Sequence, residues 1–184
     1  MTRPFAVSMP NGRNLQAFRL LIFTRHLITE LHMNNEQRAA ITESLLASGR
    51  YLDQGDFASY LSLFTEDGEY QLVSKVPEID GMATWIDLDK SELQNLLDMA
   101  PRHLWNNGLR THQISPPSFR FSEWEAHTIA TVSVFRTCSE GTTSVYAVGH
   151  YHDCWTLESS GWRLKKRIVQ LATRNLAPPS ALPL

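Results

Sequence analysis

Cysteine and long apolar stretches are both scarce in this sequence. Only two of its 184 residues are cysteine, Cys138 and Cys154, and two thiols cannot build a framework of several disulfide bonds. The longest segments without a charged residue, such as 141–152, are rich in polar side chains. They are far shorter than the roughly 20 apolar residues of a membrane-spanning helix. These absences exclude a disulfide scaffold and predict no membrane span.

An excess of charge of one sign is also missing. Seventeen basic residues against 19 acidic ones give a formal net charge of −2, which creates no strong field for nucleic acid or for an anionic membrane surface. The nine glycines are scattered and form neither a phosphate-binding loop nor a dinucleotide-binding fingerprint. We therefore predict a protein with no nucleic-acid partner and no membrane partner.

Motifs of nucleophilic and iron–sulfur chemistry are absent as well. The sequence contains no Gly-x-Ser-x-Gly segment. A Rieske site needs paired Cys-x-His and Cys-x-x-His elements. Cys138 is followed instead by Ser139-Glu140, and Cys154 by Trp155-Thr156. The pattern excludes a Rieske cluster held by this chain.

What is present fits one globular domain preceded by a different segment. The chain is 42% hydrophobic and 184 residues long, which is about the size of one domain. Residues 1–32 carry four arginines and a single acid, Glu30. This composition fits a mitochondrial-type presequence less well than a plain extension. We interpret 1–33 as an N-terminal extension, either disordered or not native if the chain starts at Met33, and 34–184 as a single domain.

Helical patterns come first in this domain. Asn34 to Gln37 forms a capping-box pattern before apolar residues at helical spacing, namely Ile41, Leu45, Leu46 and Leu52. Asp56 is a candidate N-cap for a short second helix with one apolar stripe, made by Phe57, Tyr60, Leu61 and Phe64. Asp89 with Glu92 caps a third helix that continues through Leu97. Between the last two helices, the pattern predicts a strand over 69–73 and irregular structure over 77–87.

Strand patterns follow in the second half. The pattern predicts a strand over 110–121, with Pro116-Pro117 either interrupting it or holding it at a sheet edge. Three strands joined by turns at 139–142 and 158–161 then alternate with a period of two. Their predicted inward residues are Trp124, Ala126, Thr128, Ala130, Val132 and Val134, then Val145, Ala147, Gly149, Tyr151, Asp153 and Trp155, then Trp162, Leu164, Ile168 and Ala172. Segregated helices and strands predict an α+β fold, with N-terminal helices packed on a strongly curved antiparallel sheet that leaves a hollow.

Two histidines on one strand are the most suggestive candidate site. His150 and His152 lie two residues apart, so their side chains point to the same side of a strand. Such a pair shares a metal ion if a carboxylate from elsewhere completes a facial triad for ferrous iron. Otherwise the pair forms hydrogen bonds on a sheet face or at a subunit contact. No third ligand follows from the spacing, so we predict no metal site.

Acid–base residues form a second candidate set. Asp53 and Asp56 lie near the junction of the first two helices, beside Tyr51, and His112 and His127 lie on predicted strands. A desolvated carboxylate or imidazole in the hollow would serve as a general base. The alternative is structural, with Asp56 as a helix cap and Tyr51 as a core residue.

A basic face is the third candidate. Arg163, Lys165 and Arg167 alternate along the last strand, and no acid occurs between Gly161 and Arg174. This face is either a solvated outer surface or a docking surface for an acidic partner, where complementary charge sets orientation.

Several segments together resemble a known family. The stretches Val148–Trp155, Ser160–Leu164 and Arg167–Leu171 are similar to the C-terminal half of the small (beta) subunit of aromatic-ring-hydroxylating dioxygenases, in the NTF2-like or SnoaL-like superfamily. The earlier pattern from Tyr51 through Asp56-Phe57 to Tyr70, and the ending Leu182-Pro183-Leu184, also match. The similarity covers about residues 36–184. One departure is Leu171-Ala172-Thr173, where such subunits usually have Leu-Asp-Thr.

The resemblance implies a cystatin-like, NTF2-like cone and a non-catalytic role. The partner would be a catalytic large (alpha) subunit in an α3β3 assembly, which holds the Rieske [2Fe-2S] cluster and the mononuclear iron and receives electrons from a ferredoxin and a reductase. This chain would hold no cofactor and would work in the cytoplasm, in the degradation of aromatic compounds. His150, His152, Arg163, Lys165 and Arg167 would then be interface residues.

Two other functions stay open from the residues. One is a stand-alone dehydratase, isomerase or cyclase with a pocket built from His150, His152, Asp56 and Tyr51. The other is a ligand-binding module without chemistry.

Overall fold

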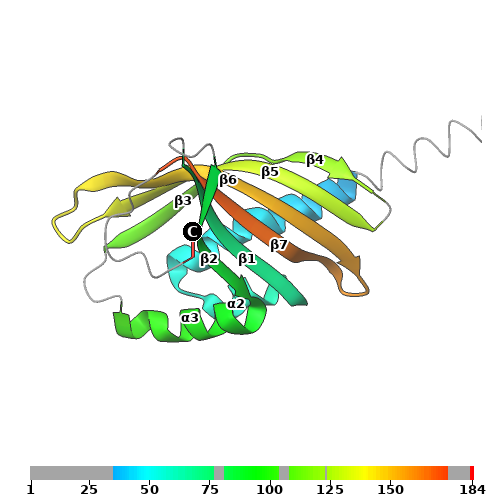
Figure 1. Ribbon diagram of the computed structural model, residues 1–184, viewed down its shortest axis with the longest axis horizontal. Coiled ribbons are helices and arrows are strands. Elements are labelled where there is room, and N and C mark those ends of the chain that lie inside the picture. The colour runs from blue at the N-terminus through cyan, green and yellow to red at the C-terminus, as the bar shows by residue number, and fades with distance from the viewer. Residues whose placement is uncertain (1–34, 77–80, 104–107, 123, 174–182) are drawn as a thin grey trace, which may run out of the picture. The chain divides into compact units, whose positions relative to one another are not determined.

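A single curved sheet organises the chain. The computed structural model describes residues 35–76, 81–103, 108–122, 124–173 and 183–184. Contacts divide the chain into Met1–Ala39 and Ala40–Leu184, and the sheet belongs to the second unit. Its strand order is β2-β1-β7-β6-β5-β3, with β4 also paired to β5 (Figure 1). The strands are β1 (Phe64–Val76), β2 (Gly81–Asp89), β3 (Leu109–Ile114), β4 (Ser118–Phe121), β5 (Glu125–Thr137), β6 (Thr143–Glu158) and β7 (Gly161–Leu171).

Two of the helices begin where the local sequence predicts, whereas their ends differ: the second ends at Ser62, before the predicted stripe residue Phe64, and the third extends past Leu97 to His103. A first helix covers 35–54 and ends at Gly55, whose φ of +70° is a left-handed conformation that favours glycine. Asp56 caps α2 (Phe57–Ser62) by accepting a hydrogen bond from the Ser59 amide at 3.1 Å. Before α3 (Lys90–His103), Asp89 and Glu92 accept from each other's amides, which confirms the predicted capping box. The capping residue proposed at Asn34 lies outside the described residues.

Two features of the sheet differ from the prediction. The segment 81–87 is not irregular but lies in β2, which pairs antiparallel with β1. In addition, β1 and β7 pair in parallel, so the sheet is mixed rather than wholly antiparallel. The predicted interruption at Pro116-Pro117 is confirmed, because it separates β3 from β4.

The core lies between the helices and the inner face of the sheet. Residues of the first helix, α2, α3 and the four strands β1, β5, β6 and β7 join one buried cluster, in which Ile41, Leu45, Leu93 and Leu97 are fully buried. The predicted inward residues of β5 from Ala126 to Val134 are confirmed as buried. The strands curve over the helices in Figure 1, so alternate side chains of β5, β6 and β7 fill the hollow or face away from it. No helix in the described ranges is long and apolar enough to cross a membrane.

Two register shifts in the sheet change which of its faces the nearby side chains point to. The β6–β7 register shifts between Cys154 and Trp155, which pair with Lys166 and Leu164 and leave Lys165 as an extra residue. Arg167 therefore faces the core, fully buried, and its predicted place on an exposed basic face was wrong. Ile168 faces outward for the same reason. A second shift, between Val134 and Phe135, leaves the predicted core residue Val145 60% exposed.

Candidate functional site

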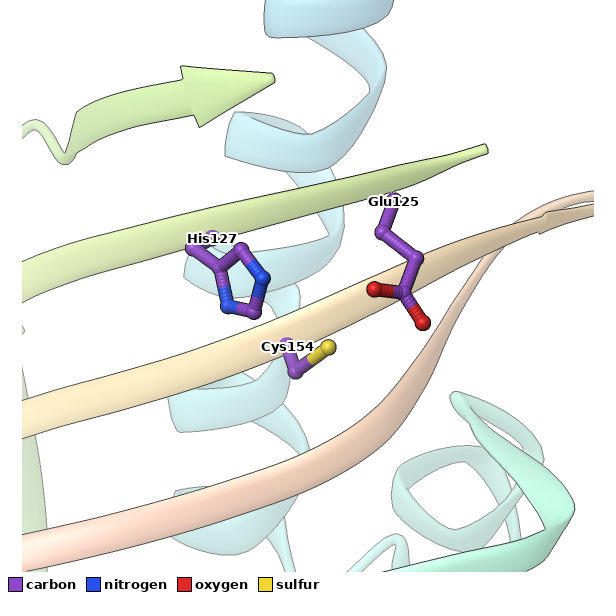
Figure 2. A group of neighbouring side chains, drawn as sticks. All are labelled: Glu125, His127 and Cys154. Atoms are coloured by element: carbon purple, nitrogen blue, oxygen red, sulfur yellow. The ribbon is translucent and has the colours of Figure 1, made fainter. Parts of the chain in front are cut away.

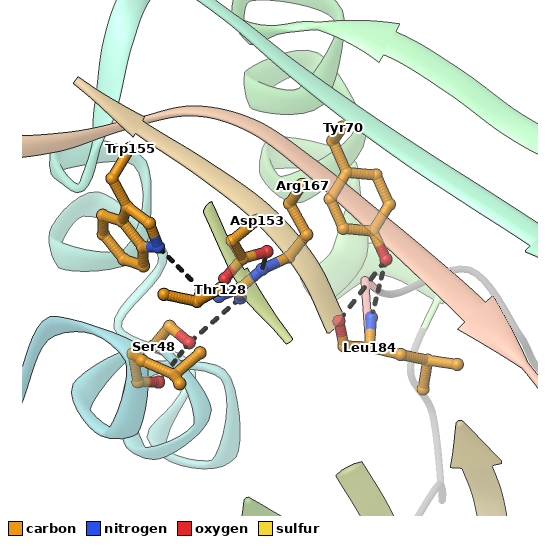
Figure 3. A network of polar contacts seen from close by, with 8 residues as sticks. Ser48, Tyr70, Thr128, Asp153, Trp155, Arg167 and Leu184 are labelled. Atoms are coloured by element: carbon orange, nitrogen blue, oxygen red, sulfur yellow. Dashed lines mark hydrogen bonds and ion pairs between the residues drawn. The ribbon is translucent and has the colours of Figure 1, made fainter. Parts of the chain in front are cut away.

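A buried ion pair occupies the inner face of β6 and β7. Arg167 donates from Nε to Asp153 Oδ1 at 2.9 Å and from Nη2 to Asp153 Oδ2 at 2.7 Å, and both side chains are fully buried (Figure 3). Arg167 Nη1 also donates to Ser48 Oγ at 3.0 Å, and that hydroxyl donates to the Leu45 carbonyl. The network ties the two central strands to the first helix.

The ring of Tyr151 packs against this ion pair, and the charge of Asp153 stabilises the charge of Arg167. The guanidinium carbon of Arg167 lies 4.1 Å from the centroid of the Tyr151 ring, within cation–π range. Burial opposes the charge on Arg167, but Asp153 outweighs it, so the pKa of Arg167 is raised. Burial likewise raises the pKa of Tyr151. The Arg167 guanidinium therefore keeps its charge, and its two parallel hydrogen bonds to Asp153 have the geometry of a bidentate arginine–carboxylate pair.

A histidine–aspartate pair lies elsewhere in the interior. His112 on β3 donates its amide to Asp53 Oδ2 at 2.8 Å, and its Nδ1 lies 2.5 Å from Asp53 Oδ1. Burial lowers the pKa of His112, although the hydrogen bond and charge of Asp53 oppose that effect. The other ring nitrogen, Nε2, is buried and has no hydrogen-bond partner within the described part of the chain. The residues predicted as a loose acid–base set thus include one real pair, Asp53 and His112.

Several other buried polar atoms also lack partners among the described residues. They are the hydroxyls of Tyr60, Tyr151 and Thr65, and Nη2 of Arg110. Arg110 Nη1 donates to the Pro183 carbonyl at 3.1 Å, and the Tyr70 hydroxyl accepts from the Leu184 amide at 3.0 Å. Large side chains fill this interior, since Trp155, Arg167, Tyr60, Tyr70 and Tyr151 are all fully buried.

The structure does not gather the predicted catalytic alternative. Asp56 is exposed and serves as the cap of α2, whereas Tyr51 is half-buried and packs against the core. His150 and His152 lie on the outer face of β6, with ring centroids 6.3 Å apart. The four residues therefore lie on both sides of the sheet.

The remaining basic residues have local partners. Arg163 donates to the Ser62 carbonyl at 2.7 Å. Lys165 pairs with Glu125 at 3.2 Å and Lys166 pairs with Glu69 at 2.6 Å. Other strands supply the acids that residues 161–174 lack, with Glu69 on the adjacent β1 and Glu125 on β5, so this face is more neutral than its sequence indicates.

A group of potential ligands also lies on the outer face. Glu125 and His127 on β5 point toward Cys154 on β6, and their ligand atoms all lie within 4.8 Å of one another (Figure 2). Burial and then the charge of Glu125 raise the pKa of the Cys154 thiol. A depression of about 510 Å³ adjoins the group and is lined by His127, His152, Cys154, Phe119 and Lys166, among others. We name Glu125, His127 and Cys154 the outer-face cluster.

Sequence reasoning missed this cluster, although part of its pattern was visible. Glu125-x-His127 places two ligands on one side of a strand. Cys154 joins them only because His127 and Cys154 are directly paired in the β5–β6 ladder. That pairing depends on the register shift near Val134, which alternation alone does not reveal.

Comparisons with known proteins identify the family. A family model described as a SnoaL-like domain matches residues 34–168. The beta subunit of 2-aminobenzenesulfonate 2,3-dioxygenase from Alcaligenes sp is 32% identical over 138 residues, which are 74% of this chain and 92% of that protein.

Solved structures agree with this assignment. The beta subunit of a protein described as an aromatic-ring-hydroxylating dioxygenase from Novosphingobium aromaticivorans superposes with a TM-score of 0.73 at 25% identity, covering 83% of this chain and 99% of that chain. A naphthalene 1,2-dioxygenase chain shares the fold, with a TM-score of 0.62 at 15% identity over 77% of this chain and 82% of that one. This chain thus belongs to the SnoaL-like family and, within it, to the small (beta) subunits of aromatic-ring-hydroxylating dioxygenases.

Proposed function

We propose that this chain is the non-catalytic small subunit of a Rieske-type aromatic-ring-hydroxylating dioxygenase, which it stabilises by assembling with the catalytic large subunit. The observation that carries the proposal is the 32% identity to a dioxygenase beta subunit across 92% of that subunit's length. A relationship of that extent covers the whole fold of the relative rather than one shared motif.

The interior of the chain supports a structural role. The hollow beneath the sheet is filled by large side chains and by the ion pair between Arg167 and Asp153. A pair with two hydrogen bonds, fully enclosed, fixes β6 and β7 against the first helix. The fold is thereby suited to present a fixed outer surface to another protein.

The proposed partner supplies the redox chemistry. The large subunit would hold the Rieske [2Fe-2S] cluster and the mononuclear iron, in an α3β3 assembly that takes electrons from a ferredoxin and its reductase. The complex would act in the cytoplasm on aromatic compounds. Residues 34–184 would form the single domain involved, with 1–33 as an extension outside it.

Interface residues are proposed on the outer face and its edge. Arg163, Lys165, His150 and His152 keep this role, since none of them is fully buried. Arg167 is withdrawn, because its side chain has no exposed surface. Its contribution to assembly is indirect, through the rigidity of β7.

Co-expression with the large subunit tests the proposal. We expect the two chains to co-purify, with iron and aromatic hydroxylation present in the complex and neither present in the small chain alone. Arg163→Glu with Lys165→Glu should weaken assembly, whereas Arg50→Glu, an exposed arginine on the first helix, serves as the matched control. Turnover of a small molecule by the isolated chain, abolished by His112→Gln, would overturn the proposal in favour of a stand-alone enzyme.

A further inference from the structure

We propose that the outer-face cluster of Glu125, His127 and Cys154 is a binding site for a divalent cation of the zinc type. This inference goes beyond the proposed function and does not depend on it. It rests on the register of two strands and on the donor atoms that they bring together.

The sheet places the three ligands without help from loops. His127 and Cys154 are direct partners in the β5–β6 ladder, and Glu125 precedes His127 by two residues on the same face. Their ligand atoms lie within 4.8 Å of one another. Ligands around one tetrahedral zinc ion lie roughly 3.5 Å apart, since each bond is about 2.0–2.3 Å long. Small rotations of side chains on fixed strands therefore suffice to close the site.

The donor set selects the kind of metal. A thiolate, an imidazole nitrogen and a carboxylate oxygen are the three ligand types that zinc accepts in proteins. Calcium and magnesium prefer oxygen ligands alone. The cluster therefore fits a borderline-soft divalent ion, and cobalt(II) is its spectroscopic substitute.

One side chain of the chain itself competes with a metal ion at this cluster. Lys165, the extra residue of the β7 bulge, places Nζ 3.2 Å from Glu125 Oε1. Both side chains are partly exposed, at 46% and 38%, so the ammonium group can move into water when a metal ion arrives. Lys165 thus competes with the metal for Glu125.

Space remains for a fourth ligand. Three protein ligands leave one position of a tetrahedral site open. The adjoining depression of about 510 Å³ is lined by His127 and Cys154 themselves. Water or a group from a docked protein can reach the ion from this side.

Cobalt(II) and zinc(II) titrations of the purified full-length chain test the site. We expect one ion per chain, a thiolate-to-cobalt charge-transfer band, and a zinc Kd of about 1 μM or tighter. Cys154→Ser should remove the band and weaken zinc binding by more than about tenfold. Lys165→Met should tighten binding, because it removes the competing cation. Circular dichroism of each variant checks that it is folded.

The other cysteine provides the matched control. Cys138→Ser, at the β5–β6 turn, should leave both the band and the affinity unchanged. Metal analysis of the complex with a co-expressed large subunit gives a second readout, namely one zinc per small subunit that is lost in Cys154→Ser. Binding only at millimolar zinc, or a band that survives Cys154→Ser, would overturn the inference.

Discussion

The inner and outer faces of the sheet around β6 and β7 each carry an ion pair, but only the inner pair is buried. On the inner face, Arg167 and Asp153 are both fully buried and joined by two hydrogen bonds. On the outer face, Lys166 and Glu69 form a pair whose side chains are 34% and 51% exposed. The two pairs have the same N–O distance to within 0.1 Å, at 2.7 and 2.6 Å.

Burial, not distance, separates the energetics of these two pairs. Removing one partner of a buried pair leaves an uncompensated charge in a medium of low polarity. Removing one partner of an exposed pair leaves a charge that water solvates. Losing one partner of the inner pair should therefore cost much more stability than losing one partner of the outer pair.

The largest effect is expected from breaking the inner pair on one side. Asp153→Ala should lower the free energy of unfolding by about 3–5 kcal/mol, because it leaves the Arg167 guanidinium buried without its partner. Urea unfolding followed by circular dichroism measures this. The double variant Asp153→Leu with Arg167→Met should recover most of the loss, since it removes both charges. A single variant no less stable than the double variant would contradict this account of the pair.

A smaller effect is expected where β6 and β7 approach closely. A Cβ added at Gly149 would lie 2.4 Å from the Gln170 carbonyl oxygen, which is backbone and cannot rotate away. Gly149→Ala should therefore destabilise the chain by about 1–3 kcal/mol through overpacking. Thermal unfolding compares it with His150→Ala, the next residue and an exposed one. Equal unfolding midpoints for the two variants would contradict the predicted overpacking at Gly149.

The histidine of the interior should make stability depend on pH. The pKa of His112 lies below its ordinary value of 6.5 in the folded chain, chiefly because the ring is buried. The unfolded chain therefore binds a proton more readily, and stability should fall as the pH falls through 6.5 toward the folded pKa. Unfolding midpoints measured between pH 8 and 5 should show a shallower decline in His112→Asn. An identical decline in both proteins would remove His112 as its source.

The smallest effect is expected on the outer face. Glu69→Gln breaks the pair with Lys166, and both groups remain accessible to water. The free energy of unfolding should change by about 1 kcal/mol or less, and any change should shrink in high salt. Urea unfolding at low and high salt measures it. A loss as large as that of Asp153→Ala would erase the distinction between the faces.

Local patterns predicted the elements that depend on neighbours in sequence. The caps at Asp56 and at Asp89 with Glu92 are confirmed, because each is made within one helical turn. The β2 strand was missed, since its residues alternate between half-buried and exposed and include an exposed Trp85. The parallel pairing of β1 with β7 joins distant segments, and no local pattern encodes it.

The site was harder to predict because one extra residue in a strand, a β-bulge, reverses which of the following side chains point into the core. Strict alternation placed Arg167 beside Arg163 and Lys165, but the bulge at Lys165 turns it inward. Spacing singled out His150 and His152 on one strand, whereas the ligand cluster joins two strands. A period of two predicts which residues share a face only as far as the next bulge.

The parallel contact between β1 and β7 also sets an order of events during synthesis. The strand at the centre of the sheet is the last one made, so β1 with β2 and β3 to β6 emerge from the ribosome before the strand that joins them. Until then, both halves expose unpaired edges and apolar surface, which are the features that promote aggregation. A chain truncated before Gly161 would therefore yield two unjoined half-sheets rather than a shortened version of the fold.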